Sequence, residues 1–104
     1  MENDVLNIVT GIKEVSAGIL MKDITIVKGF NQRQIEKLAQ QTIRVKRGIA
    51  SGNYSEKKKD YVLNELKLMT RNFVDTLIGI VTITIEKLLN ALVRFLYEAV
   101  GVVV

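Results

Sequence analysis

The chain has 104 residues, enough for one domain with one core, and we predict a single helical domain over residues 1–104. Hydrophobic residues make up 48% of the chain and its formal net charge is +4, so it lacks the low hydrophobicity that disorder requires. It contains no cysteine and no histidine. This excludes disulfides and cysteine metal sites, and it removes the usual general base near neutral pH. We therefore predict a non-enzymatic protein with no catalytic residues, metal site or cofactor.

The first half of the chain has the periodicity of two amphipathic helices. Polar or small residues between positions 4 and 28 recur in steps of three and four, with aliphatic residues between them. Gly29 stands where a helix C-terminal glycine belongs, and Asn31 with Gln34 three residues later resembles a capping box. We therefore predict a helical hairpin made of residues 3–28 and 32–50. Residues 24–27 are β-branched, so a strand is the alternative there.

The second half predicts one long C-terminal helix over residues 56–98. Ser55 is a suitable N-cap, and a line of polar residues with helical spacing runs from Asn72 to Glu98. This line passes through the β-branched residues 80–85, for which a strand paired with residues 24–27 is the alternative. An unbroken helix of this range would be about 65 Å long. It must therefore either bend, most simply near Gly79, or form a rod that other chains cover.

The apolar face of this C-terminal helix is wider than a bundle helix needs. A bundle helix buries an arc of about 100°, whereas here the arc exceeds half the circumference. Phe73, Leu77 and Ile80 lie at its centre and are expected to pack within the chain. The residues on its flank are predicted to face a partner: Ile78, Ile85, Leu89 and Leu96. We therefore predict an all-α structural or adaptor protein in an oligomeric helical bundle or docked on a helical protein partner. The alternative is a core helix wrapped by the first two helices.

Basic residues are concentrated in the middle of the chain. Residues 31–71 carry a net charge of +6, against −1 for the segment on either side. Such a concentration suits phosphates or other anionic surfaces, so the second predicted function is a nucleic-acid-associated accessory subunit. A solvated helix face with no ligand is the simpler interpretation. The predicted anion-binding patch consists of Arg33, Lys37, Arg44, Arg47, Lys57, Lys58 and Lys59.

A membrane surface is the third and least favoured partner. The charge-free residues 77–85 are far fewer than the roughly 20 that span a bilayer. An interfacial helix usually has a polar face rich in Lys and Arg, whereas the C-terminal helix carries Asp75, Glu86 and Glu98 there. The chain begins with an acidic segment where a secretory signal needs basic residues, so we predict a cytoplasmic protein. The apolar residues 100–104 are expected to be buried.

Overall fold

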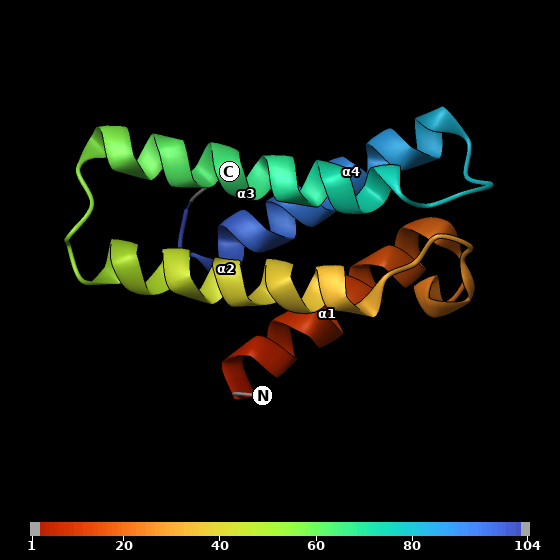
Figure 1. The fold of residues 1–104 in the computed structure, drawn as a ribbon, viewed down its shortest axis with the longest axis horizontal. Helices are drawn as coiled ribbons and strands as arrows, with labels where there is room; N and C mark the ends of the chain where they lie inside the picture. Colours follow the sequence, from red (N-terminus) through yellow and green to blue (C-terminus); the bar gives the residue numbers. More distant parts are fainter. Residues whose placement is uncertain (1–2, 103–104) are drawn as a thin grey trace.

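A computed structural model of the chain describes residues 3–102. Over this range the chain forms four α-helices, one short 3-10 turn and no strand (Figure 1). The all-helical prediction is therefore confirmed for the described residues, and the strand alternatives are excluded there. The elements are α1 (Asn3–Leu20), the 3-10 turn η1 (Ile24–Ile26), α2 (Gln32–Ala50), α3 (Glu56–Asp75) and α4 (Thr82–Ala99).

Consecutive helices run in opposite directions around one core. Helix α1 packs on α2 and α4, and α3 packs on the same two helices, while α2 and α4 lie across the diagonal. This is the up-down-up-down arrangement of a four-helix bundle, in which short connections join antiparallel neighbours. The α1–α2 and α3–α4 connections lie at one end of the bundle, on the right in Figure 1. We call residues 21–31 and 76–83 the loop end, and residues 51–55, at the opposite end, the turn end.

Local capping explains where α2 and α3 begin. The Asn31 side chain accepts hydrogen bonds from the backbone N–H groups of Arg33 and Gln34 at 3.0 and 3.4 Å. The Ser55 hydroxyl accepts one from the backbone N–H of Lys58 at 3.1 Å. Each bond satisfies a donor that the first turn of a helix leaves without an intrahelical partner. Both caps are the ones that the sequence indicates.

Helix α1 is shorter than the predicted range 3–28. It ends at Leu20 because Met21 adopts a left-handed backbone conformation, with φ of 59°, which ends the α-helical hydrogen bonding. Asp23 then caps η1 by accepting a hydrogen bond from the backbone N–H of Thr25 at 2.9 Å. The β-branched residues that follow lose side-chain freedom in a helix. The tight turn buries two of them, Ile24 and Val27, in the core.

The predicted helix over residues 56–98 is two helices. Helix α3 ends at Asp75, where the Thr76 hydroxyl donates a hydrogen bond to the carbonyl oxygen of Phe73 at 2.7 Å. Gly79 adopts a φ of +85° in the connection, and the chain reverses there. Of the two alternatives for this segment, the structure therefore shows a bend near Gly79 and not a continuous rod. Because α4 folds back, the described residues measure 41 × 28 × 19 Å instead of about 65 Å in length.

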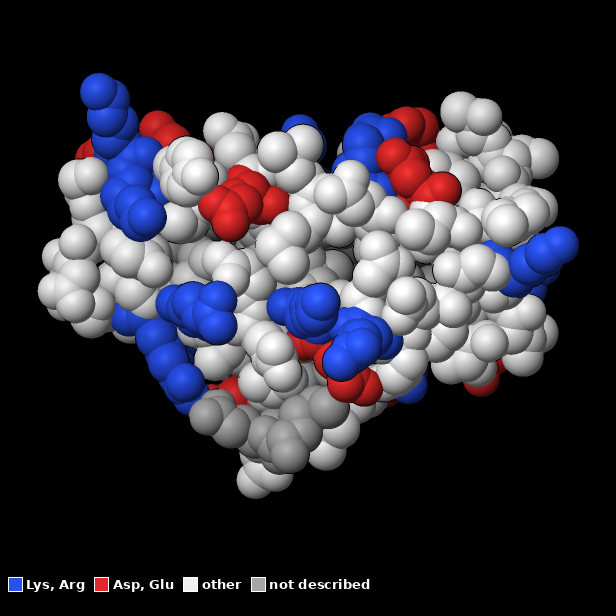
Figure 2. Space-filling view, in the orientation of Figure 1, with Lys and Arg blue, Asp and Glu red and all other residues white. Residues whose placement is uncertain are grey.

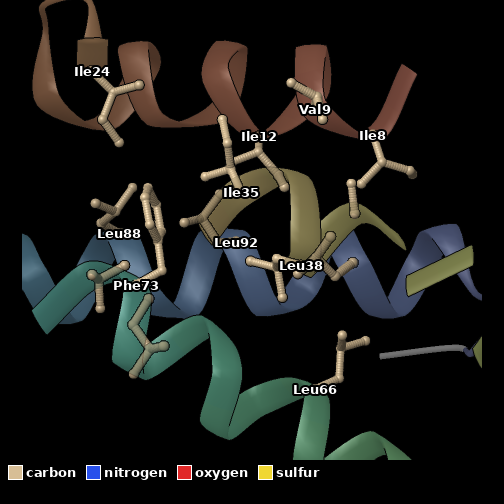
Figure 3. Packing of buried hydrophobic residues seen from close by; sticks show 14 of the residues in the cluster. Ile8, Val9, Ile12, Ile24, Ile35, Leu38, Leu66, Phe73, Leu88 and Leu92 are labelled. Carbon is tan, nitrogen blue, oxygen red and sulfur yellow. The ribbon is translucent and has the colours of Figure 1, made fainter. Parts of the chain in front are cut away.

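The core contains aliphatic side chains from all four helices and η1 (Figure 3). Phe73 is its largest fully buried side chain and meets the Phe30 ring edge-on, with 6.3 Å between centroids. Three buried hydroxyl residues, Ser16, Thr42 and Thr70, each donate a hydrogen bond to the carbonyl four residues earlier. These bonds remove the penalty of burying a polar group. In the apolar tail, which was predicted to be buried, Val100 is buried, Gly101 is exposed and Val102 is half-buried, whereas residues 103–104 lie outside the described residues.

Candidate docking surfaces

The four predicted interface residues do not form one surface. Leu89 and Leu96 are only 2% and 0% exposed, so in the folded chain they face neighbouring helices and not solvent. Ile85 is half-buried, and Ile78 is 55% exposed at the loop end. The wide apolar arc is covered inside the chain because α4 packs against α1 on one flank and α3 on the other. The reason for predicting a partner at Leu89 and Leu96 therefore disappears.

Large exposed apolar side chains gather instead at the loop end. Their exposed fractions lie between 55% and 87%. In Figure 2 this end, on the right, is largely uncharged, and basic side chains project from its middle. The other large apolar side chains that are exposed in residues 3–102 are Leu6 on α1 and the pair Tyr61 and Leu68, which line one shallow pocket on α3. We call the loop-end residues the apolar tip: Met21, Ile26, Ile78, Val81 and Ile83.

The two loops that carry the apolar tip are joined to each other. The backbone N–H of Ile78 donates a hydrogen bond to the carbonyl oxygen of Lys28 at 2.8 Å. Gly29 has a φ of +89°, and a Cβ at this position would overlap the carbonyl oxygen of Thr76. Only glycine allows this close approach of the two backbones. The tip is therefore a defined surface built by two loops that are far apart in the sequence.

Met21 has the most exposed side chain of the tip, and this side chain contributes little packing to the fold. It is 87% exposed and has a φ of 59°, which is unfavourable for a side chain with a Cβ. Glycine would adopt this conformation more easily, and it is the usual residue at such a position after a helix. A large apolar side chain in solvent at a strained position has no structural explanation here, which favours a functional one.

Basic side chains border the tip, while the carboxylates nearby are engaged within the chain. Two exposed lysines lie in the α1–α2 connection, Lys22 and Lys28, and two further exposed cations lie near the starts of α2 and α4, Arg33 and Lys87. The Thr25 hydroxyl and backbone N–H donate to the Asp23 carboxylate at 2.7 and 2.9 Å and hold its pKa below the ordinary value. Glu86 accepts two hydrogen bonds from Arg71, both of 3.2 Å, which raise the pKa of that arginine.

The predicted anion-binding residues form an extended stripe. Six of the seven side chains are exposed, and Lys59 is half-buried in an ion pair with Glu56 at 3.1 Å. The Lys58 Nζ lies over the rings of Tyr54 and Tyr61, 5.9 and 5.4 Å from their centroids. In Figure 2 basic side chains follow α2 along the molecule. The residues at positions 44, 47 and 57–59 lie towards the turn end, whereas Arg33 and Lys37 lie in the first half of α2, towards the loop end.

Two further possibilities are a metal site and a membrane-spanning helix, and neither is found in residues 3–102. No group of three or more His, Cys, Asp or Glu side chains there could hold a metal ion. None of the helices in that range is long and apolar enough to cross a membrane. Comparison with protein-family models, curated proteins and solved structures finds no match for this chain. The apolar tip and the basic stripe are therefore the features from which a function can be argued.

Sequence reasoning named only Ile78 among the tip residues. The other four escaped because the helical wheel placed residues 21–28 and 77–83 on continuous helices. A usable signal was present: each of the two β-branched segments lies close to a glycine, Gly29 or Gly79, that adopts a positive φ. β-branched residues that adjoin a turn glycine are poor candidates for a helix interior. They could have been assigned to loops on that ground.

Proposed function

We propose that this protein is a non-enzymatic adaptor that acts by docking through its apolar tip. The observation that carries the proposal is the concentration of exposed aliphatic side chains on two joined loops of a closed bundle. Single exposed apolar residues are ordinary, but a contiguous apolar patch marks an interaction site. Loops held by a rigid scaffold are also where binding residues concentrate. A cytoplasmic setting is part of this proposal.

Assembly through the flank of α4 is not part of the proposal. Leu89 and Leu96 are covered by the chain's own helices, so a partner would have to open the bundle to reach them. The tip, by contrast, is accessible without any change in the fold. A docking surface on the loops therefore needs no reorganisation free energy, which favours it over one on the helix flank.

The absence of cysteine from the chain allows a direct test of docking. Ile26→Cys places a single thiol in the tip, and Leu68→Cys places one on α3, where the native side chains are 73% and 62% exposed. In the purified protein we expect both thiols to react with a membrane-permeant maleimide at similar rates. In the producing cells, docking should slow the reaction of Ile26→Cys about tenfold, which corresponds to about 1.4 kcal/mol. Leu68→Cys should react as it does in the purified protein. Equal rates for both variants in both settings would exclude a docked tip.

A second candidate is a nucleic-acid accessory subunit that uses the basic stripe. Its support is the line of exposed cations on α2 and at the start of α3, with Tyr54 and Tyr61 on either side of Lys58. Lysine and arginine contacts to phosphates release counterions, so such binding should weaken steeply as salt rises. Aromatic rings near a basic surface can stack on unpaired bases.

A charge-matched pair of variants tests this second candidate. Replacing residues 44, 47 and 57–59 by glutamine should abolish retention on single-stranded DNA without unfolding the chain. The control variant removes five charges elsewhere and should retain the salt-dependent binding: Lys13, Lys22, Lys67, Lys87 and Arg94. Equal retention of the two variants would show that any DNA binding reflects net charge and not the stripe.

A further inference from the structure

We infer that the body on which the apolar tip docks is the surface of an anionic lipid bilayer. The tip would place its aliphatic side chains just below the lipid headgroups, with the bundle standing on its loop end. This inference rests on the proposed function, because it names the occupant of the same tip. It differs from an amphipathic helix lying in the interface, since the inserted residues belong to two loops and the first turn of α4.

The size of the tip favours a lipid surface over a protein partner. A stable protein interface buries about 800 Å² and about 20–30 residues on each side. The tip provides five side chains on two loops and the first turn of α4, too few for a stable interface of that kind. Shallow insertion needs no such area, because mobile acyl chains surround each inserted side chain separately.

The composition of the tip leads to the same conclusion. Energetically dominant residues at protein interfaces are mainly Trp, Tyr and Arg, and lysine is depleted there. The tip consists of isoleucine, valine and methionine and is bordered by Lys22 and Lys28. The aromatic side chain nearest in sequence, Phe30, is half-buried and packs on Phe73. Aliphatic side chains beside lysines combine hydrophobic insertion with attraction to anionic headgroups.

Hydrophobic insertion alone would hold the protein only weakly. A single myristoyl chain gives a binding constant of about 10⁴ M⁻¹, and stable attachment needs a second signal such as a basic patch. The tip side chains together contain about as much aliphatic material as such a chain, and part of each is already covered by the fold. The exposed cations around the tip provide the second signal. Binding should therefore require anionic lipid and should be reversed by salt.

The proposed orientation separates the two groups of basic residues. The described part of the molecule is 41 Å long, and the turn end lies opposite the loop end (Figure 1). Attraction between exposed charges falls off over about 8–10 Å at physiological salt. Lys22 and Lys28 would lie within this distance of the headgroups, whereas Lys57 and Lys58 would lie several such lengths away. Lys22 and Lys28 should therefore strengthen membrane binding, whereas Lys57 and Lys58 should not.

Co-sedimentation with vesicles tests the inference. The purified chain should bind vesicles of phosphatidylcholine with phosphatidylserine at least about tenfold more tightly than phosphatidylcholine alone. Replacing Ile26 and Ile83 together by serine should weaken binding about a hundredfold, and Leu68→Ser should leave it unchanged. All of these positions are exposed, so circular dichroism should show intact helices. No binding by the wild-type chain, or equal binding by the tip and Leu68 variants, would overturn the inference.

A second pair of variants tests the orientation. Replacing Lys22 and Lys28 by glutamine should weaken binding about 20- to 30-fold, since each lysine near an anionic surface contributes about fivefold. The same change at Lys57 and Lys58 should have no effect. An environment-sensitive dye on Ile26→Cys should shift its emission to the blue on these vesicles, whereas the dye on Leu68→Cys should not. Equal losses for the two lysine pairs would overturn the end-on arrangement.

The outcomes separate this inference from the proposed function. If the vesicles fail to bind while Ile26→Cys is protected in cells, the tip docks on something other than lipid and only the present inference falls. If a rise in mass with concentration depends on Ile26 and Ile83, the occupant is a second copy of the chain and the membrane assignment is again wrong. If Ile26→Cys is neither protected in cells nor sensitive to vesicles, both proposals fall.

Discussion

The two ends of the bundle both connect helices, but they are built differently. At the turn end the connection is polar: Ser55 caps α3, and the Tyr54 ring lies against Gly48, which has no Cβ to obstruct it. At the loop end five aliphatic side chains stand in solvent. Connections on a protein surface are ordinarily polar, because they must hydrate their backbone. The turn end shows that this fold is compatible with such a connection, so the apolar loop end calls for a functional explanation.

Helix α4 contains the same contrast within two turns. Ile83, in its first turn, is 67% exposed, whereas Leu89 is 2% exposed. Both are large and aliphatic, but a helical wheel places Leu89 on the apolar flank and Ile83 on the polar face, between Asn90 and Arg94. Leu89 therefore faces the helices that pack on α4, whereas Ile83 faces solvent. Burial here follows position around the helix.

The largest expected effect compares these two residues directly. Leu89→Glu removes core packing, which alone costs about 2–5 kcal/mol, and also buries a charge. This approaches the total stability of a small domain, so the variant should lose its helical circular dichroism signal. Ile83→Glu should change the free energy of unfolding by less than about 0.5 kcal/mol. A folded Leu89→Glu monomer would show that this flank is not core, and the original prediction of a partner face would return.

The next effect concerns the contact that joins the two loops. Gly29 and Gly79 both have positive φ values, +89° and +85°, but only at Gly29 would a Cβ overlap a neighbour, the Thr76 carbonyl. Gly79→Ala should cost about 1–2 kcal/mol from backbone strain alone. Gly29→Ala should cost about 1–3 kcal/mol more, because the loops must separate. Urea unfolding measures the difference, and faster amide exchange at Ile78 should accompany it. If the two substitutions lower the free energy of unfolding equally, the two loops can separate freely.

A smaller effect is expected where α4 is fastened to α3 in the closed part of the bundle. The Tyr97 hydroxyl donates to the Leu63 carbonyl at 2.8 Å, and burial raises the pKa of this tyrosine above 10.0. Stability from the neutral hydroxyl is therefore complete below pH 10 and is lost as the pH rises through the folded-state pKa. Tyr97→Phe should cost about 1 kcal/mol near neutral pH and flatten the alkaline decline. Thermal unfolding across this pH range checks both effects, and a decline as steep as that of the wild type would contradict the assignment.

The smallest effect has the opposite sign. Met21→Gly relieves a left-handed strain of about 1–2 kcal/mol and adds about 0.5–1 kcal/mol of backbone entropy cost. Because Met21 is 87% exposed, little packing is lost, and the chain should gain up to about 1 kcal/mol. The same variant should bind phosphatidylserine vesicles less tightly than the wild type. Stabilisation together with weaker binding would show that Met21 serves docking at the expense of the fold; loss of stability would assign it a structural role.

Only part of the candidate site could be predicted from the sequence. The basic residues were found because charge is visible residue by residue, and their exposure on α2 follows from the alternation around that helix. The tip was missed except for Ile78, because its members come from two segments separated by about half the chain. Their proximity depends on the Ile78–Lys28 hydrogen bond and on the space left by Gly29. Neither contact has a local sequence signature that identifies the partner.

The sequence by itself determined the helical character of the chain and the caps at Asn31 and Ser55. These features depend on residues within three or four positions of one another, so a local pattern contains the necessary information. Tertiary structure alone decided that the C-terminal helix reverses near Gly79 and that Leu89 and Leu96 are covered by the chain's own helices and not by a partner. An aliphatic side chain is stabilised equally by any neighbour that removes it from water. The pattern can therefore show that a residue should be covered, but only packing shows which helix covers it and which residues remain exposed for a partner.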